Sequence, residues 1–486
     1  MKPIIRKKLV ALLYVIGMAT ITGNVNAHDE GNAGLPVCLE GNFMVADAQF
    51  APFASNNGPG RVLEMNIFTG QRGITVNNPF IADNVGTTIV PEGIAAPGPW
   101  KPTGVLSGGL NGHAFITSAA QHALTEFHRD GTPIRTVKLP MDDDPRFGTV
   151  PRLLGSQMMP NGNIIQNVCD ANFTGTTGAA VNSDPNTKGY FPPVWSTPER
   201  AQNSRLLVID QETLEVIDEY SAPDDPRWTC MAGVIFSDEG MYVSMFHGAA
   251  VFVIDWKAGM EEEKSTGVGS NGELDADDDN DGKKVFKLNR KKNKAKVIRV
   301  IDMLGPDADL YDPRRRDSLR AITFDEGGNL YAAFRARATE PNAGSPADFR
   351  QHVAIVPKGE SYPTRTIAMD HGVQVIDGIR TNRISGPGCV AINPGFTDPD
   401  KCNVETLYVA ASAFNPGDCD GTAGGCFKPG GGVGEYLINP DLADGPDCRD
   451  GNVGCAKPIA TFLGTANGED NIDPRMLMTI HESFVQ

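Results

Sequence analysis

The feature that most constrains this chain of 486 residues is a short strand–turn–strand pattern that recurs along it. In each copy, an apolar strand is followed by a turn of Gly, Asn or Asp and then by a second apolar strand. The second strands are "GNFMVADA" from Gly41, "GHAFITSA" from Gly112, "GNIIQNVC" from Gly162, "GMYVSMF" from Gly240, "GNLYAAF" from Gly328 and "ETLYVAA" from Glu405. Such self-similarity indicates a repeat architecture, in which each unit buries its apolar face against its neighbours.

The repeat predicts an all-β fold, a β-propeller. A third strand such as "VAIVP" and a fourth complete each unit, and 54 glycines and 35 prolines supply the turns. We expect six blades of four antiparallel strands, or seven if a long insertion holds a further blade. The first unit lacks an inner strand, and "RMLMTIHESF" at 475–484 has the profile of one. We therefore expect the C-terminal strand to join the N-terminal blade and close the ring.

One copy of the repeat carries a family resemblance. The stretch "AITFDEGGNLYAAF" at 321–334 resembles the repeat of NHL- and YVTN-type propellers, in which an apolar strand, a D/N-G turn and "LYVA" recur. The resemblance covers the chain at the level of the repeat and implies only the fold. Propellers of this kind include hydrolases, oxidases, binding modules and scaffolds, so the repeat identifies no activity.

Residues 1–27 have the composition of a secretory signal. Basic residues precede the apolar stretch "LVALLYVIGMATIT", and small residues precede a cleavage point after Ala27. We expect one propeller domain at 28–486, periplasmic or secreted, with no membrane span once the signal is removed; retention as an anchor is the alternative. The net charge of −17 argues against nucleic acid and anionic membranes as partners, and leaves a small molecule or a protein.

Two segments interrupt the repeat. Residues 257–296 form a charged insertion in the fourth blade, and residues 415–456 form a Gly/Asp/Cys-rich loop region in the sixth. The insertion contains alternating carboxylates that precede Gly282 as in an oxygen-ligand calcium loop, namely Asp275, Asp277, Asp279 and Asp281. Leu288 stands where an EF-hand requires glutamate, which excludes a complete EF-hand. A looser calcium loop and a solvated acidic run are the two interpretations.

Nine cysteines in an exported chain favour disulfides. Pairing between near neighbours would join Cys419 to Cys426, Cys448 to Cys455 and Cys389 to Cys402. This pairing leaves Cys38, Cys169 and Cys230, one of which would be unpaired. A zinc site made of cysteines is disfavoured, because no two cysteines have the required spacing and no histidine lies near them.

Three of the eight histidines follow the second strand of their unit. His122, His247 and His352 lie where we expect the second-to-third connections of blades two, four and five. These connections share a face with the links between blades, so the three imidazoles would surround the mouth of the central channel. Converging imidazoles in an oxidising compartment favour copper, with zinc as the alternative. His371 and the N-terminal His28 of the cleaved chain are further candidates. The competing interpretation is that these histidines simply occupy polar turns.

Two other histidines are assigned elsewhere. His113 opens a second strand and so belongs to the opposite end of its blade, and His128 ends a third strand at the surface.

A basic residue precedes or opens most of the expected first strands. The series is Lys101, Arg152, Arg227, Arg320, Arg383 and Arg475. At a channel mouth, Arg227, Arg320, Arg383 and Arg475 would attract and clamp an anionic substrate. The alternative, which we favour slightly, is that these arginines pair with the aspartates of neighbouring "DPR" triplets such as 225–227.

Three functions fit these observations. The first is an exported copper-dependent oxidoreductase that acts on a small substrate, with an anion as one option. The second is a non-catalytic binding or surface-assembly module stabilised by calcium and disulfides. The third is a calcium-dependent lactonase or esterase. The sequence identifies no catalytic residue, so it does not decide whether the protein is an enzyme.

Overall fold

The structure is a computed structural model. It describes residues 43–47, 61–65, 79–81, 102–106, 112–118, 122–128, 133–140, 152–169, 204–225, 227–245, 249–257, 292–303, 318–337, 349–368, 375–385, 398, 403–412, 432–437, 460–462 and 474–479. The secondary structure within these ranges is all β, and they contain no helix long and apolar enough to cross a membrane.

The strands are short and follow one another closely. They are β1 (Phe43–Asp47), β2 (Arg61–Met65), β3 (Pro79–Ile81), β4 (Pro102–Leu106), β5 (Ala114–Ser118), β6 (Ala123–Phe127), β7 (Pro133–Lys138), β8 (Arg152–Met158), β9 (Ile164–Cys169), β10 (Arg205–Ile209), β11 (Val216–Ser221), β12 (Met231–Phe236), β13 (Met241–Met245), β14 (Ala250–Ile254), β15 (Lys292–Lys294), β16 (Val297–Asp302), β17 (Ser318–Phe324), β18 (Leu330–Arg337), β19 (Phe349–Val356), β20 (Arg365–Ala368), β21 (Val375–Ser385), β22 (Asn403–Ser412), β23 (Gly432–Leu437), β24 (Ala460–Phe462) and β25 (Pro474–Thr479).

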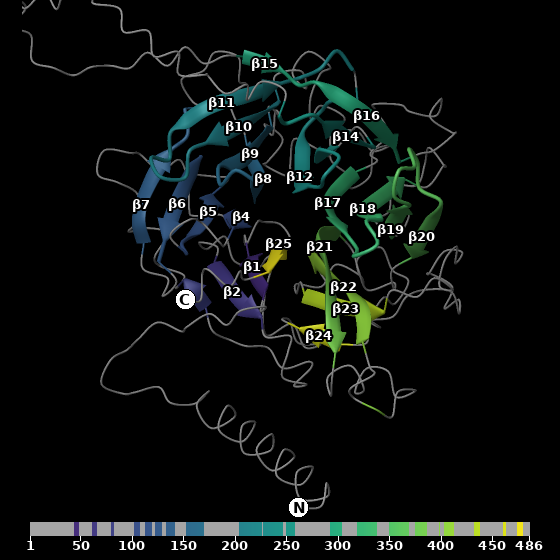
Figure 1. The fold of residues 1–486 in the computed structure, drawn as a ribbon. Helices are drawn as coiled ribbons and strands as arrows, with labels where there is room; N and C mark the ends of the chain where they lie inside the picture. Colours follow the sequence, from purple (N-terminus) through teal and green to yellow (C-terminus); the bar gives the residue numbers. More distant parts are fainter. Residues whose placement is uncertain are drawn as a thin grey trace, which may run out of the picture.

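These strands form separate sheets arranged around a common centre (Figure 1). Their orders are β25-β1-β2-β3, β4-β5-β6-β7, β8-β9-β10-β11-β15, β12-β13-β14-β16, β17-β18-β19-β20 and β21-β22-β23-β24. We name each sheet after its innermost strand, and each innermost strand packs against that of the next sheet. Apart from β15, which pairs parallel with β11, the strand pairs are antiparallel. Sheets placed radially in this way make a β-propeller, which confirms the all-β propeller predicted from the repeat.

The two ends of the chain meet in one sheet. β25 pairs antiparallel with β1, with Phe43 opposite Thr479 and Val45 opposite Leu477. β1 pairs on its other side with β2. The C-terminal strand therefore supplies the innermost strand of the N-terminal sheet, as the sequence predicted.

The core lies between neighbouring sheets. One apolar cluster joins the β25, β4 and β8 sheets, a second joins the β8 and β12 sheets, and others continue through the β17 and β21 sheets. The middle strands β5, β6, β13 and β14 are buried along their whole length, whereas the outer strand β7 has exposed ends. Middle strands are covered on both faces, which explains why their sequences are nearly continuous apolar runs.

Each innermost strand is irregular near its beginning. The register against the second strand shifts at Thr103, Leu154–Gly155, Ala232–Gly233, Arg320–Ala321, Asp377 and Arg475. At Gly155, an added Cβ would lie 2.2 Å from the carbonyl oxygen of Ala232 on β12. Glycine therefore allows two innermost strands to approach closely beside a bulge, where bulges typically bend a strand and redirect its side chains.

Candidate functional site

The connections between strands place two sets of residues at opposite ends of the sheets. Cys169 ends the second strand β9, and Cys230 precedes the innermost strand β12. Both lie at the end where second strands lead into third strands, which we call the Cys169 face. His113 precedes β5 and His128 follows β6, so they lie at the other end, which we call the His113 face. The sequence predicted the functional site on the Cys169 face.

His122 lies on the Cys169 face, in the connection between β5 and β6. It is only 6% exposed and has a positive φ of 51°. Its carbonyl oxygen accepts a hydrogen bond of 2.8 Å from the amide of Leu139, which follows β7. Ala249 has the same role before β14, with a φ of 45° and a 2.9 Å bond from Met303 to its carbonyl oxygen. The left-handed conformation therefore belongs to this kind of hairpin and is not specific to the histidine.

The three candidate metal-binding histidines occupy different positions of the repeat. In each hairpin, the first residue of the second strand pairs with a residue of the third strand. Ala123, Ala250 and His352 each lie four residues before that third-strand residue, so their positions are equivalent. Relative to that position, His122 stands one residue earlier and His247 three residues earlier. The expectation of one shared position was therefore wrong. His352 lies within β19 instead of in a connection, because β18 and β19 extend further than the other hairpins.

These histidines also belong to separate sheets. β6, which follows His122, and β19, which contains His352, lie in different parts of the ring in Figure 1. His247, His371 and His28 lie outside the described residues, as do the calcium candidates Asp275, Asp277, Asp279 and Asp281. Within the described ranges, no group of three or more His, Cys, Asp or Glu side chains is arranged to hold a metal ion. Copper binding by His122, His247 and His352 stays a prediction.

Arg227 is engaged by two carboxylates. Its Nε and Nη2 donate to Asp225 at 3.1 and 2.8 Å, and its Nη1 donates to Asp302 at 3.4 Å. Burial alone would raise the pKa of Asp225, but the hydrogen bonds and charge of Arg227 lower it below its ordinary value. The hydrogen bond to Asp225 likewise raises the pKa of Arg227. Arg227 thus makes the structural "DPR" pairing that the sequence offered as the alternative to substrate binding.

The other three candidate arginines do not all lie at the same end of their innermost strands. Arg320 lies in the bulge of β17 and Arg475 in the bulge of β25, both near the Cys169 face. Arg383 lies beyond the bulge of β21, opposite Glu405. The Glu405 carboxylate accepts a hydrogen bond from the amide of Glu326, in the connection on the His113 face. Arg383 was expected to precede a first strand "GCVAINPG" from Gly388, but the innermost strand of this sheet is β21, and Arg383 lies near its end. Arg383 therefore belongs to the opposite end from its expected place.

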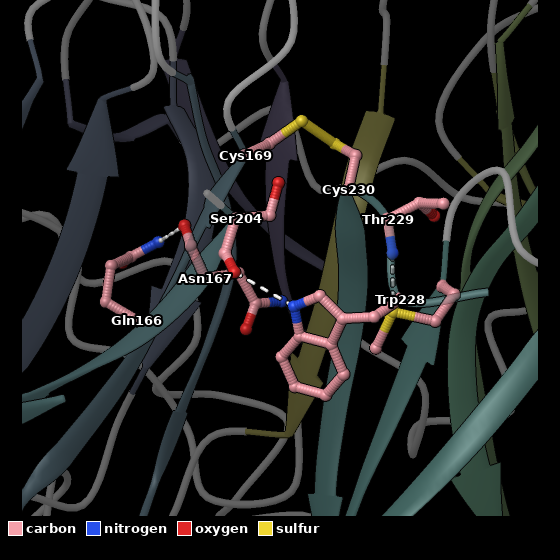
Figure 2. Close-up of a disulfide and its surroundings, with 8 residues drawn as sticks. Gln166, Asn167, Cys169, Ser204, Trp228, Thr229 and Cys230 are labelled. Carbon is pink, nitrogen blue, oxygen red and sulfur yellow. Dashed lines mark hydrogen bonds between the residues drawn. A yellow bond between two sulfur atoms is a disulfide. The ribbon is translucent and has the colours of Figure 1, made fainter. Parts of the chain in front are cut away.

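A disulfide joins two neighbouring sheets at the Cys169 face. Cys169 and Cys230 are bonded across a sequence separation of 61 residues (Figure 2). Beside it, the buried Trp228 donates from Nε1 to the carbonyl oxygen of Ser204 at 2.9 Å and packs edge-on against Phe252. These two cysteines were left over by the local pairing scheme. Cys38 and the six cysteines of the three local pairs lie outside the described residues.

Buried polar side chains beside the bulges were missed at the sequence level. Ser244 accepts from the amide of Gly233 at 2.7 Å and donates to the carbonyl oxygen of Arg320 in the next sheet at 2.6 Å. Thr117 donates to Oε1 of Gln166, also in the next sheet, at 2.7 Å. The signal was a polar residue at the fourth position of an apolar second strand. Thr117 and Ser244 therefore link neighbouring sheets.

Comparisons with known proteins add a likeness of fold. No family model and no curated protein matches the chain. A protein of unknown function from Bacteroides caccae is 10% identical with a TM-score of 0.40, covering 91% of this chain and 100% of that one. A luciferin-regenerating enzyme is 10% identical with a TM-score of 0.35, covering 67% and 75%. Virginiamycin B lyase from Staphylococcus aureus is 12% identical with a TM-score of 0.32, covering 70% and 71%. At these values the likenesses carry no argument about function, and the propeller is assigned from its strand pairing.

Proposed function

We propose that this chain is an exported six-bladed β-propeller that binds copper at the Cys169 face and acts there as an oxidoreductase on a small anionic substrate. The observation that carries the proposal is His122, a buried imidazole on a hairpin fixed by the bond from Leu139. The backbone of His352 lies within one repeat position of the same level, and the sequence places His247 in the corresponding hairpin of the β12 sheet. His122 and the backbone of His352 therefore lie toward the same end of their sheets, and the sequence predicts that end for His247 as well.

The residues around the face favour imidazole ligands over thiolates. Cys169 and Cys230 are bonded to each other, so neither offers a thiolate to a metal. Their disulfide supports an oxidising compartment, and hence export through a signal at 1–27. Imidazole nitrogen suits copper and zinc, and copper binds more tightly in the general order of divalent metals. In this proposal His122, His247 and His352 hold the metal, with His371 and His28 as further donors.

The substrate side of the proposal depends on the innermost strands. Arg320 and Arg475 lie in bulges close to the Cys169 face, and bulges are frequent beside active sites. Basic residues on these innermost strands would attract a small anion to an acidic protein. Arg227 is left out of this role because Asp225 and Asp302 engage it. The carboxylates at 275–281 are proposed to bind calcium and order the charged insertion, away from the reaction.

The test is elemental analysis of the cleaved, untagged protein after dialysis. We expect about one copper ion per chain, and loss of that ion in each of His122→Ala, His247→Ala and His352→Ala. Loss in all three would establish a shared site. His128→Ala, on the opposite face, serves as the matched control and should keep the metal. Absence of copper and zinc from the wild-type protein, or retention in all three variants, would refute the metal site.

A non-catalytic binding module is the second candidate, and the engagement of Arg227 favours it. A guanidinium already held by two carboxylates stabilises the connection between two sheets and is not available to a substrate. This alternative predicts a protein without stoichiometric transition metal, with ligand binding that is unchanged in the three histidine variants. A calcium-dependent lactonase would instead hydrolyse its substrate and lose activity on addition of a calcium chelator.

A further inference from the structure

Two imidazoles are in direct contact on the His113 face. Ala114 of β5 pairs with Phe127 of β6, so His113 and His128 stand opposite each other at the next level of the same hairpin. Their ring centroids are 5.1 Å apart and their planes meet at 87°. His128 is exposed, and the side chain of His113 is 21% exposed. Residues at facing positions of neighbouring strands have Cβ atoms about 5 Å apart, a spacing that lets two histidines reach one ion.

A buried carboxylate fixes one of the two rings. Nδ1 of His113 lies 2.6 Å from Oε1 of Glu126, which is only 3% exposed. Oε2 of Glu126 accepts a hydrogen bond of 2.6 Å from Nε of Arg135, so both carboxylate oxygens act as acceptors. The proton of this contact therefore resides on Nδ1 of His113. The lone pair of the ring is then on Nε2, away from Glu126.

We propose that His113 and His128 form a binding site for a divalent transition metal ion such as Cu²⁺, Ni²⁺ or Zn²⁺. Nε2 of His113 and one ring nitrogen of His128 would be the protein ligands, and water would fill the other positions. Metal-bound histidines commonly donate their second ring nitrogen to a carboxylate, which is the arrangement of His113 with Glu126. The exposed side chain of His128 can rotate. Both rings can therefore bind one metal ion without movement of the strands.

The donor set determines the class of ion. Imidazole nitrogens suit copper, nickel and zinc, whereas calcium and magnesium require oxygen ligands. The only carboxylate in contact with the pair, among the described residues, is Glu126, and it is occupied by His113 and Arg135. Two protein ligands give a site that exchanges its metal with solution. This site lies at the opposite end of the β4 sheet from His122, so it does not depend on the proposed copper centre.

The experiment uses the cleaved full-length protein after treatment with a chelator. NiCl₂ or CuSO₄ is added, and binding is followed by calorimetry, by the rise in Tm, and for Cu²⁺ by the nitrogen couplings in the EPR spectrum. We expect the wild-type protein to bind an ion with imidazole nitrogen couplings. His128→Ala should weaken binding at this site at least about 10-fold, since one of two protein ligands is lost. His113→Ala should have the same effect, and Glu126→Gln should weaken binding about 10- to 100-fold.

The His128 variant decides the outcome, because an exposed side chain can be removed without loss of the fold. The control is Tyr362→Ala, which removes an exposed side chain of another sheet and should leave metal binding unchanged. Equal affinity in wild-type protein and in the His113→Ala/His128→Ala double variant would overturn the proposal. The two metal proposals fail separately, since copper retained through dialysis and lost only in His122, His247 or His352 variants belongs to the other face.

Discussion

Two halves of the propeller place different side chains beside the bulges of their innermost strands. Beside each inner-strand bulge, the second strand places one small residue: Thr117, Asn167 and Ser244 in three consecutive sheets, and Ala333, Ala410 and Ala46 in the other three. Small size is the shared requirement, since neighbouring innermost strands approach closely there. We call the β4, β8 and β12 sheets, which carry the three polar residues, the polar half. There, Ser244 and Thr117 also donate hydrogen bonds to the next sheet. The polarity of Thr117 and Ser244 thus serves contacts between sheets.

The largest expected effect comes from the covalent link in the polar half. The double variant Cys169→Ser/Cys230→Ser should lower the free energy of unfolding by about 2–5 kcal/mol, because the closed loop no longer restricts the unfolded chain. Denaturant unfolding of oxidised wild-type and variant protein measures the change. The control is the addition of a reductant to both proteins, which should destabilise the wild-type protein more than the variant. Equal stability of the oxidised wild-type and variant proteins would show that the bond contributes nothing to holding the β8 and β12 sheets together.

The next effect tests the close approach of the innermost strands. Gly155→Ala places a Cβ 2.2 Å from the Ala232 carbonyl oxygen, and backbone must move to relieve it. We expect a loss of about 3 kcal/mol, at the upper end of overpacking effects. At Gly233 the nearest atom would be the Ser244 hydroxyl at 3.1 Å, and the equivalent residue of β17 is already Ala321.

Gly233→Ala is therefore the matched control, with an expected loss of about 1 kcal/mol or less. The Tm of both variants gives the order. If the two substitutions cost the same, the tight contact at Gly155 has no special role.

The sequence predicted the architecture better than the site. The second strands, the inner position of the C-terminal strand and the antiparallel pairing were all visible, because apolar strands and Gly turns repeat at regular intervals. The error over His352 came from strand length. β18 and β19 extend past the level where shorter hairpins turn, and local sequence contains little information on where a hairpin ends. Arg383 was misplaced because "GCVAINPG" from Gly388 was assigned as the innermost strand, whereas that strand is β21 at Val375–Ser385.

The contacts between sheets were not predictable from pattern alone. Cys169 and Cys230 are far apart in sequence, and only the ring brings the end of β9 beside the start of β12. The His113–His128 contact depends on the pairing register of β5 and β6. A change of one residue in that register would give every residue a different partner. In contrast, the pairing of Arg227 with Asp225 is local and was anticipated from the "DPR" triplet. Contacts between residues close in sequence could therefore be predicted, whereas contacts between residues far apart in sequence could not.

A smaller effect separates two polar residues of the polar half. Ser244→Ala removes the partner of the buried Gly233 amide and of the Arg320 carbonyl oxygen, and should cost about 1–3 kcal/mol. The side-chain amide of Asn167 is fully buried and has no hydrogen-bond partner among the described residues. Asn167→Ser, which copies the residue of the β12 sheet, should change stability by less than about 1 kcal/mol or increase it.

Urea midpoints of the two variants make this comparison. A large loss in Asn167→Ser would indicate that a buried water molecule satisfies the amide, as is common for polar groups in protein interiors.

The smallest expected effect is the pH dependence that Asp225 adds. Its pKa is lowered in the folded protein, so its contribution is present above the unfolded pKa of about 3.9. That contribution is lost as the pH falls below this value and through the lower folded pKa. Asp225→Asn should therefore cost about 1 kcal/mol or less near pH 7, as expected for a partly exposed pair, and progressively less as the pH falls through the folded pKa.

Unfolding of wild-type protein and Asp225→Asn at a series of pH values measures the difference between their free energies. Asp302→Asn is the companion variant, and its effect should be smaller because Asp302 makes one contact of 3.4 Å with Arg227 against the two-point contact of Asp225. A difference that stays constant from pH 7 to pH 2 would mean that Arg227 is not held by the charge of Asp225. The guanidinium would then be available for an anion, and Arg227 would rejoin Arg320 and Arg475 as a candidate substrate clamp.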